Sequence, residues 1–345
     1  MDRKYVEYSV EMAEKLIAID SPTGYTAKAA AWVEKEFKAL GFDTRITNKG
    51  GVLVDLGGED SSDAILLMTH LDTIGAMVAE IKANGRLRMS PLGGLHAPGL
   101  EGENVRVYTR SGKVYTGTIQ LPNPSVHVAD EYDKAERSWK TLECVLDETV
   151  LSKEDVRKLG IENGDIVALD PKFTLTPSGY IKSRFLDDKL SVAIAFGIAK
   201  YIQDNKIVPK RKIWLHVTVY EEIGHGASAS VPEGVTEGLS VDMGCVGEGL
   251  ECTEREVSIA AKDSGGPYSY ETVSALIEGA RREGAEYRVD VYPHYGSDVE
   301  TTLRSGHDIR HGLIGPGVFA SHSYERSHVD GVMNTLLVLK GYLGL

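Results

Sequence analysis

Three apolar, strand-like segments each end in histidine or acidic residues, and this repeated pattern constrains the fold more than any other feature. The segments and their endings are Leu66–Thr69 before His70 and Asp72, Val217–Tyr220 before Glu221 and Glu222, and Leu239–Val241 before Asp242. In open α/β sheets, functional side chains gather in the crevice beyond the carboxyl ends of the strands. We therefore expect these residues to lie together at one edge of a sheet.

Two further segments are expected to contribute to the same crevice. Asp187 and Asp188 directly precede a helical stretch that begins near Lys189, and the positive end of a helix favours carboxylates. His322 follows the turn Gly315-Pro316-Gly317 late in the chain. The predicted site thus combines two histidines with several carboxylates.

Strand and helix patterns alternate in most of the chain. The predicted helices are 1–20, 26–40, 189–201 and 270–283, and the predicted strands are 51–56, 64–68, 213–220 and 287–292. The strand 64–68 lacks polar alternation, which is typical of a strand buried on both faces. Such alternation predicts an α/β fold in which helices cover both faces of a sheet.

Residues 77–177 have a different texture, in which turn dipeptides such as Asn84-Gly85 and Asn163-Gly164 separate short β-branched segments. We interpret this region as an inserted β domain. The main domain would then be discontinuous and consist of residues 1–76 and 178–345. A length of 345 residues is consistent with about two domains.

Composition excludes several classes of protein. The net charge of −13 makes a nucleic acid a poor partner, and no apolar stretch approaches the roughly 18 residues that a membrane span needs. Three cysteines, an odd number, predict no disulfide framework. Without a signal-peptide pattern at the N-terminus, we expect a cytoplasmic protein.

The predicted set of side chains has the chemistry of a site for two metal ions. Clustered carboxylates in a dry crevice repel one another, so protons or cations must compensate their charge. Histidines with carboxylates and no thiolate suit Zn²⁺ or Co²⁺ better than Ca²⁺. One carboxylate can bridge two ions, a bridging water then becomes a nucleophile, and the spare glutamate of an adjacent pair can act as general base.

Each piece has an ordinary explanation when it is taken alone. Paired glutamates are usually a solvated helix surface, and Asp187-Asp188 is also compatible with a simple N-cap. His225 and His328 are the best competitors for a ligand position. Glycosidase chemistry needs only a carboxylate pair and gives no reason for His70 and His322. The five segments together favour the metal site.

In this order, the motifs of the chain resemble those of the tetrahedral (TET-type) aminopeptidase family, which includes glutamyl aminopeptidases and proteins once labelled endoglucanases. The similar segments are Ser21-Pro22-Thr23-Gly24-Tyr25, His70-x-Asp72-x-Ile74-Gly75, Pro91-Leu92-Gly93-Gly94, Phe185-Leu186-Asp187-Asp188, Glu221-Glu222-Ile223-Gly224, Val241-Asp242 and His322-Ser323. They span nearly the whole chain.

The resemblance implies roles for single residues. Asp187 would bridge two divalent ions, Zn²⁺ or Co²⁺ with Mn²⁺ as a further option. The remaining roles would be His70 and Asp242 as ligands of one ion, Glu222 and His322 as ligands of the other, Glu221 as general base, and Asp72 as the partner that orients His70. The resemblance also implies a cis peptide between Asp187 and Asp188.

The resemblance further implies a phosphorylase/hydrolase-like zinc-peptidase domain with a mixed central sheet flanked by helices. The insert would be a small β-barrel-like dimerisation domain, and dimers would assemble into a homododecamer. The expected activity is removal of N-terminal residues from small peptides by a metal-bridging hydroxide. Two alternatives stay open: an amidohydrolase of an N-acylated or amidated dipeptide, and a catalytically silent assembly or binding protein.

The chain departs from the family pattern in two places, Tyr295-Gly296-Ser297-Asp298-Val299 and Phe319-Ala320-Ser321. Both departures leave the predicted ligands unchanged and concern substrate preference. The sequence Ala-Ser-His-Ser-Tyr-Glu-Arg around His322 resembles a branch of the family that is associated with systems making a dipeptide-derived osmoprotectant.

Overall fold

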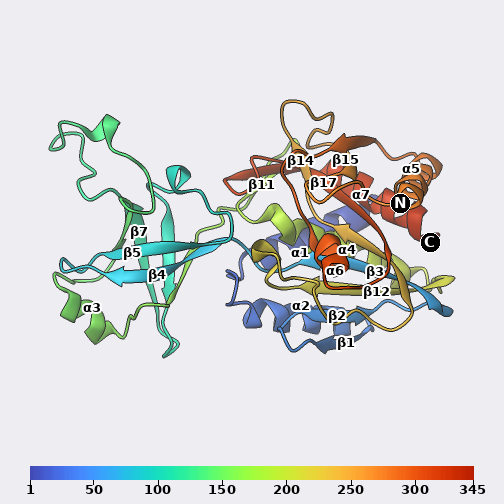
Figure 1. Cartoon of the computed structure of the whole chain (residues 1–345), viewed down its shortest axis with the longest axis horizontal. Helices are drawn as coiled ribbons and strands as arrows, with labels where there is room; N and C mark the ends of the chain where they lie inside the picture. The colour runs from blue at the N-terminus through green and yellow to red at the C-terminus, as the bar shows by residue number, and fades with distance from the viewer. The chain divides into compact units, whose positions relative to one another are not determined.

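The computed structural model describes residues 1–345 and divides into two compact units (Figure 1). The first unit comprises residues 1–72 and 172–345, and the second comprises residues 73–171. These divisions lie a few residues before the domain boundaries expected from the sequence, at 76/77 and 177/178.

The first unit is built around a twelve-stranded mixed sheet. Its strands are β1 (Asp43–Ile46), β2 (Val52–Asp55), β3 (Asp60–His70), β10 (Thr174–Leu175), β11 (Tyr180–Ser183), β12 (Arg211–Thr218), β13 (Val235–Val241), β14 (Gly244–Val246), β15 (Val257–Lys262), β16 (Tyr287–Val291), β17 (Arg310–Phe319) and β18 (Glu325–His328). The main path has the order β1-β2-β12-β3-β13-β17-β18-β11-β10. Within it, the four neighbours β12, β3, β13 and β17 are parallel, so their carboxyl ends lie at one edge.

Strand β3 shows why the sheet is buried on both faces. Its alternate residues Ile65 and Leu67 belong to one apolar core, and Leu66 and Met68 belong to a second one. Successive side chains of a strand point to opposite faces, so an uninterrupted apolar run is stable only between two covered faces. The predicted α/β fold with a mixed, helix-flanked sheet is confirmed.

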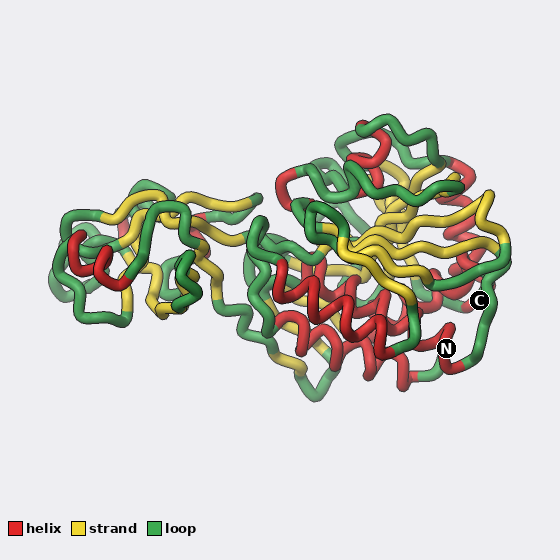
Figure 2. The backbone as a smooth tube through the Cα atoms, turned by 90° about the horizontal axis from the view of Figure 1, so that it is seen from below, coloured by secondary structure: helices red, strands yellow, loops and turns green.

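Six helices accompany this sheet: α1 (Arg3–Ile17), α2 (Ala27–Ala39), α4 (Leu186–Asp204), α5 (Tyr270–Glu283), α6 (Asp298–Arg304) and α7 (Val329–Leu343). Figure 2 shows them in red beside the yellow strands. All except α6 contribute to the larger core, and Val299 of α6 packs in the other. Phe37 of α2 stacks on Phe196 of α4 with ring centroids 4.0 Å apart. The apolar character of α4 therefore reflects burial inside this unit.

The second unit is the predicted β insert, and it forms a closed six-stranded antiparallel barrel in the order β4-β5-β8-β7-β6-β9. Its strands are β4 (Gly75–Ile81), β5 (Leu87–Leu92), β6 (Asn104–Tyr108), β7 (Val114–Gln120), β8 (Glu143–Leu146) and β9 (Ile166–Leu169), with helix α3 at Lys153–Leu159. Closure pairs every edge strand, which protects the backbone groups that an open edge would expose.

No helix in either unit combines the length and the apolar character that a membrane span would require.

Candidate metal centre

The four parallel strands place the predicted residues at one edge of the sheet. Thr218 at the end of β12 is in register with His70 at the end of β3, and Val241 at the end of β13 is in register with Ile314 of β17. The predicted residues follow these ends: Glu221 and Glu222 in the short 3-10 helix η3 (Glu221–Ile223), Asp242 after β13, and His322 between β17 and β18. Asp187 comes from the first turn of α4.

One aspartate lies between the two histidines. Asp187 Oδ1 is 3.0 Å from His70 Nε2, and Asp187 Oδ2 is 3.5 Å from His322 Nε2. His322 Nε2 is also 3.5 Å from Glu222 Oε2. Because its two oxygens face different histidines, Asp187 has the position that a carboxylate bridging two cations requires.

A second group surrounds the other side of His70. Ligand atoms of His70, Asp188 and Asp242 lie within 4.8 Å of one another, as do those of His70, Asp187 and Glu222. The structure thus brings His70, Asp187, Glu222, Asp242 and His322 together. Asp188, which the sequence did not indicate as a ligand, lies among them.

His70 directs its Nε2 atom into this cluster, where that atom lies 3.0 Å from Asp187 Oδ1. Its Nδ1 lies 2.9 Å from the carbonyl oxygen of Asp72, which can only accept, so Nδ1 carries a proton. In the neutral ring, Nε2 is then free to bind a cation, as in metal-ligating histidines oriented through their other nitrogen.

The contact that orients His70 differs from the expected one. Its hydrogen bond goes to the main-chain oxygen of Asp72, whereas the Asp72 carboxylate is 3.9 Å from His70 Nδ1. That carboxylate accepts from the main-chain N–H of Glu221 at 3.1 Å and from the hydroxyl of Thr23 at 2.7 Å. Asp72 therefore connects His70 with the segment that carries Glu221.

The raised pKa values of the clustered side chains indicate that the cluster needs positive charge to balance its carboxylates. Burial raises the pKa of Glu222 to about 8 and that of Asp242 to about 7. Burial opposes the charged form of His322, but its hydrogen bond with Asp187 and the charge of that carboxylate outweigh this and raise its pKa to about 10. Protons thus balance much of the carboxylate charge.

Divalent cations can replace those protons, and one buried oxygen lacks any partner. Asp188 Oδ1 is buried without a hydrogen bond, although the other oxygen of that carboxylate accepts from His70 N at 3.0 Å. Unsatisfied buried carboxylate oxygens are costly unless a cation or proton completes them. Two imidazoles together with several carboxylates form a set of donors that fits Zn²⁺ or a similar ion.

Glu221 and its neighbour Glu222 approach different histidines: Glu221 lies near His70, and Glu222 lies near His322. The Oε2 atom of Glu221 lies 3.7 Å from His70 Nε2, and burial raises the pKa of Glu221 well above the ordinary range. A carboxylate with a raised pKa is a stronger base than an ordinary one, which suits a group beside the ligand cluster for accepting a proton.

Comparison with known proteins identifies the family. A sequence model described as M42 glutamyl aminopeptidase matches residues 50–337. The chain belongs to the M42 glutamyl aminopeptidase family. The predicted TET-type family and enzyme class, an aminopeptidase, are thereby confirmed.

Relatives of this M42 chain match it along nearly its whole length. It is 42% identical over 338 residues to YhfE of Bacillus subtilis, covering 98% of each chain. The aminopeptidase APDkam598 from the archaeon Desulfurococcus kamchatkensis shares the fold with a TM-score of 0.88 at 23% identity, covering 98% of this chain and 95% of that one. The Pyrococcus horikoshii TET1 peptidase, described as assembling into a tetrahedron or a large octahedral shell, gives 0.85 at 23% identity, covering 97% and 99%.

Near the predicted metal ligands, the backbone departs from regular helix and strand conformations. The peptide between Asp187 and Asp188 is cis, as expected from the resemblance. Phe185, Tyr220 and His322 have left-handed φ angles of 69°, 69° and 63°. Residues of these types rarely adopt such angles, and tertiary contacts must hold them there.

Contacts near the site come from residues to which the sequence assigned no role in metal binding. Glu325 accepts hydrogen bonds from the main-chain N–H groups of Asp187 and His322, and the hydroxyl of Tyr295 donates to Met243 O at 2.9 Å, next to Asp242. The contacts of Glu325 with Asp187 and of Tyr295 with Met243 join residues 138 and 52 positions apart, so no local pattern indicates them.

Other sequence candidates lie outside the cluster. His225 is exposed, and His328 caps α7 by accepting from Asp330 N.

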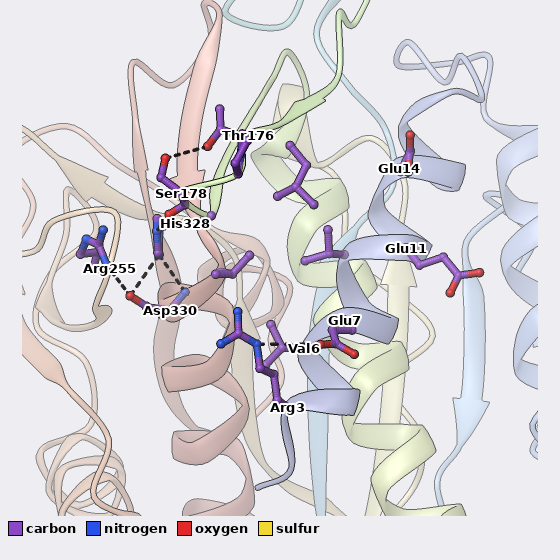
Figure 3. Close-up of a pocket in the computed structure, with 15 residues that line it drawn as sticks. Arg3, Val6, Glu7, Glu11, Glu14, Thr176, Ser178, Arg255, His328 and Asp330 are labelled. Carbon is purple, nitrogen blue, oxygen red and sulfur yellow. Dashed lines mark hydrogen bonds and ion pairs between the residues drawn. The ribbon is translucent and has the colours of Figure 1, made fainter.

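A separate cavity of about 630 Å³ is formed by α1, the turn after β10 and the start of α7 (Figure 3). None of the predicted ligands lines it, and its arginines are already paired, Arg3 with Glu7 and Arg255 with Asp330.

Proposed function

We propose that this M42 family member is a dinuclear metal-dependent aminopeptidase that removes N-terminal residues from small peptides, with Glu221 as general base. The observation that carries the proposal is the convergence of two histidines and several carboxylates at the ends of four parallel strands. The distances of 3.0–3.5 Å between Asp187, Glu222 and the histidines support shared coordination.

In this proposal Asp187 would be a ligand of both ions. His70 and Asp242 would be the other ligands of one ion, and Glu222 and His322 those of the other. Two Zn²⁺ or Co²⁺ ions, with Mn²⁺ as a further option, would supply Lewis acidity for the scissile carbonyl and lower the pKa of water.

Glu221 is the residue that transfers the proton in the proposed reaction. Its carboxylate takes a proton from the attacking water and passes it to the leaving amine. Asp72 holds the main-chain N–H of Glu221 at 3.1 Å, which fixes the segment relative to His70. The acidic surroundings would recognise the free α-amine of the peptide.

Substrate preference tests the activity. With Co²⁺ or Zn²⁺ restored, we expect the protein to hydrolyse a set of aminoacyl reporters with a free α-amine and to leave their N-acetylated forms nearly intact. A screen across side chains in both series measures reaction class and preference together. Turnover of only the blocked series would identify an amidohydrolase, and a protein that binds no divalent ion after gentle purification would be the catalytically silent alternative.

We also propose that the barrel unit mediates dimerisation and that dimers form a dodecamer in the cytoplasm. The assembly described for the Pyrococcus horikoshii peptidase supports this state. Twelve chains of 37.5 kDa each give 450 kDa, and we expect light scattering of the purified protein to report that mass. A mass of about 75 kDa, that of two chains, would contradict the dodecamer.

A further inference from the structure

Glu325, the first residue of β18, connects two of the predicted ligands through their backbone. Its side chain is 1% exposed. Oε2 accepts from the main-chain N–H of Asp187 at 3.1 Å, and Oε1 accepts from that of His322 at 2.9 Å. One buried carboxylate therefore joins the start of α4 to the loop between β17 and β18.

The two N–H groups require a side chain with two acceptor oxygens. Each oxygen of Glu325 serves one donor, and glutamine of the same shape offers one acceptor oxygen and an amino group that only donates. A glutamine could satisfy one ligand segment but would direct its own N–H toward the other. The charge is costly, because Glu325 is buried near the Asp187 carboxylate. The contact therefore needs two acceptor oxygens, which glutamine does not supply.

Both connected segments have backbone conformations that need support. His322 has φ +63° and Ala320 has φ +59° in the loop between β17 and β18, and Phe185 has φ +69° before Asp187. Non-glycine residues leave the left-handed region readily unless neighbouring contacts hold them. The bond from His322 N to Glu325 closes the loop that presents the imidazole, and the bond from Asp187 N ties that loop to α4.

We propose that Glu325 is a positioning residue that sets the separation of Asp187 and His322 and, through it, the affinity for the ion that these two residues and Glu222 share. This inference rests on the proposed dinuclear function. Outer partners that orient ligands typically change metal affinity by about 10- to 100-fold when they are replaced. A merely structural role would alter thermal stability and leave the affinity of a folded protein unchanged.

The test is Glu325→Gln, with Asp290→Asn as the matched control. Asp290 is also buried and also uses both oxygens, accepting from Glu251 N at 2.9 Å and from the Ser258 hydroxyl at 2.7 Å, and it is hydrogen-bonded to no predicted ligand. Each purified protein is stripped and titrated with Co²⁺ against a competing chelator. Visible absorption of bound Co²⁺ reports each site, and thermal unfolding of the metal-free proteins reports folding.

We expect E325Q to bind the ion of His70 and Asp242, the first ion, as the parent protein does. The ion of Glu222 and His322, the second ion, should bind about 10- to 100-fold more weakly and with an altered Co²⁺ spectrum. D290N should bind both ions normally. Glu325→Asp keeps the charge, is one methylene shorter and can reach only one N–H, so it should also weaken the second ion; it serves as the readout if E325Q does not fold.

Two results would overturn the inference: parental affinity for both ions in a folded Glu325 variant, or equal weakening in D290N. Failure of the proposed function is distinguishable, because the parent protein itself would then bind fewer than two ions.

Discussion

Glu221→Gln is expected to retain both metal ions and to lose about 10²- to 10⁴-fold in turnover. Glutamine has the shape of glutamate but cannot accept the proton. The main-chain N–H of Glu221 would keep its 3.1 Å hydrogen bond to Asp72, so the segment should stay in place. Steady-state kinetics with a free-amine reporter, together with metal analysis of the same sample, measures both quantities.

The adjacent glutamate supplies the control. Glu222→Gln replaces a side chain 3.5 Å from His322 Nε2 that is predicted to bind an ion, so this variant should lose metal as well as activity. The two variants differ by one position in the chain and separate proton transfer from coordination. Near-parental turnover of metal-loaded E221Q would remove Glu221 from the role of general base.

Removal of divalent ions is expected to abolish hydrolysis, and their affinity should rise with pH. In the metal-free protein the pKa of Asp242 is raised to about 7, that of Glu222 to about 8 and that of His322 to about 10. At pH 6 these groups hold protons that a cation must displace. Each displaced proton makes binding about tenfold tighter per pH unit, as long as the pH is below the pKa of its group.

Calorimetric titration with Zn²⁺ or Co²⁺ at pH 6, 7 and 8 measures this dependence. Buffers with different ionisation enthalpies give the number of protons released. Activity after chelation should return when the ion is restored. An affinity that stays constant from pH 6 to 8, with no proton release, would show that the ligands are already deprotonated in the metal-free protein.

The fold could be predicted where the signal is local. Helix α5 spans Tyr270–Glu283, as expected, because Ser269 caps its first turn and Gly284 adopts the left-handed conformation at its end. Strand β3 was recognised from its apolar run. Elsewhere the local pattern was misleading: Tyr220 looks like the end of a strand, but β12 stops at Thr218 and Tyr220 is left-handed.

The site was predicted by residue type and not by contact. Ligand chemistry at the ends of apolar segments indicated the candidate segments, and the resemblance to the family selected His70, Asp187, Glu222, Asp242 and His322 within them. The role of Asp72 changed in detail, because its carbonyl oxygen rather than its carboxylate meets His70 Nδ1. Asp188 and Glu325 lie in segments that the sequence indicated, but it gave neither residue a role, because the contacts that define those roles are visible only in the structure.

The sequence by itself determined which side chains are available for coordination and which segments are apolar enough to form buried strands, since both properties belong to short stretches of chain. Only the tertiary structure decided that β12, β3, β13 and β17 lie in parallel register and that Glu325 joins Asp187 to His322. These arrangements depend on contacts between residues far apart in the chain, 73 positions for Glu237 and Arg310 of β13 and β17 and 138 positions for Asp187 and Glu325, which no local periodicity encodes.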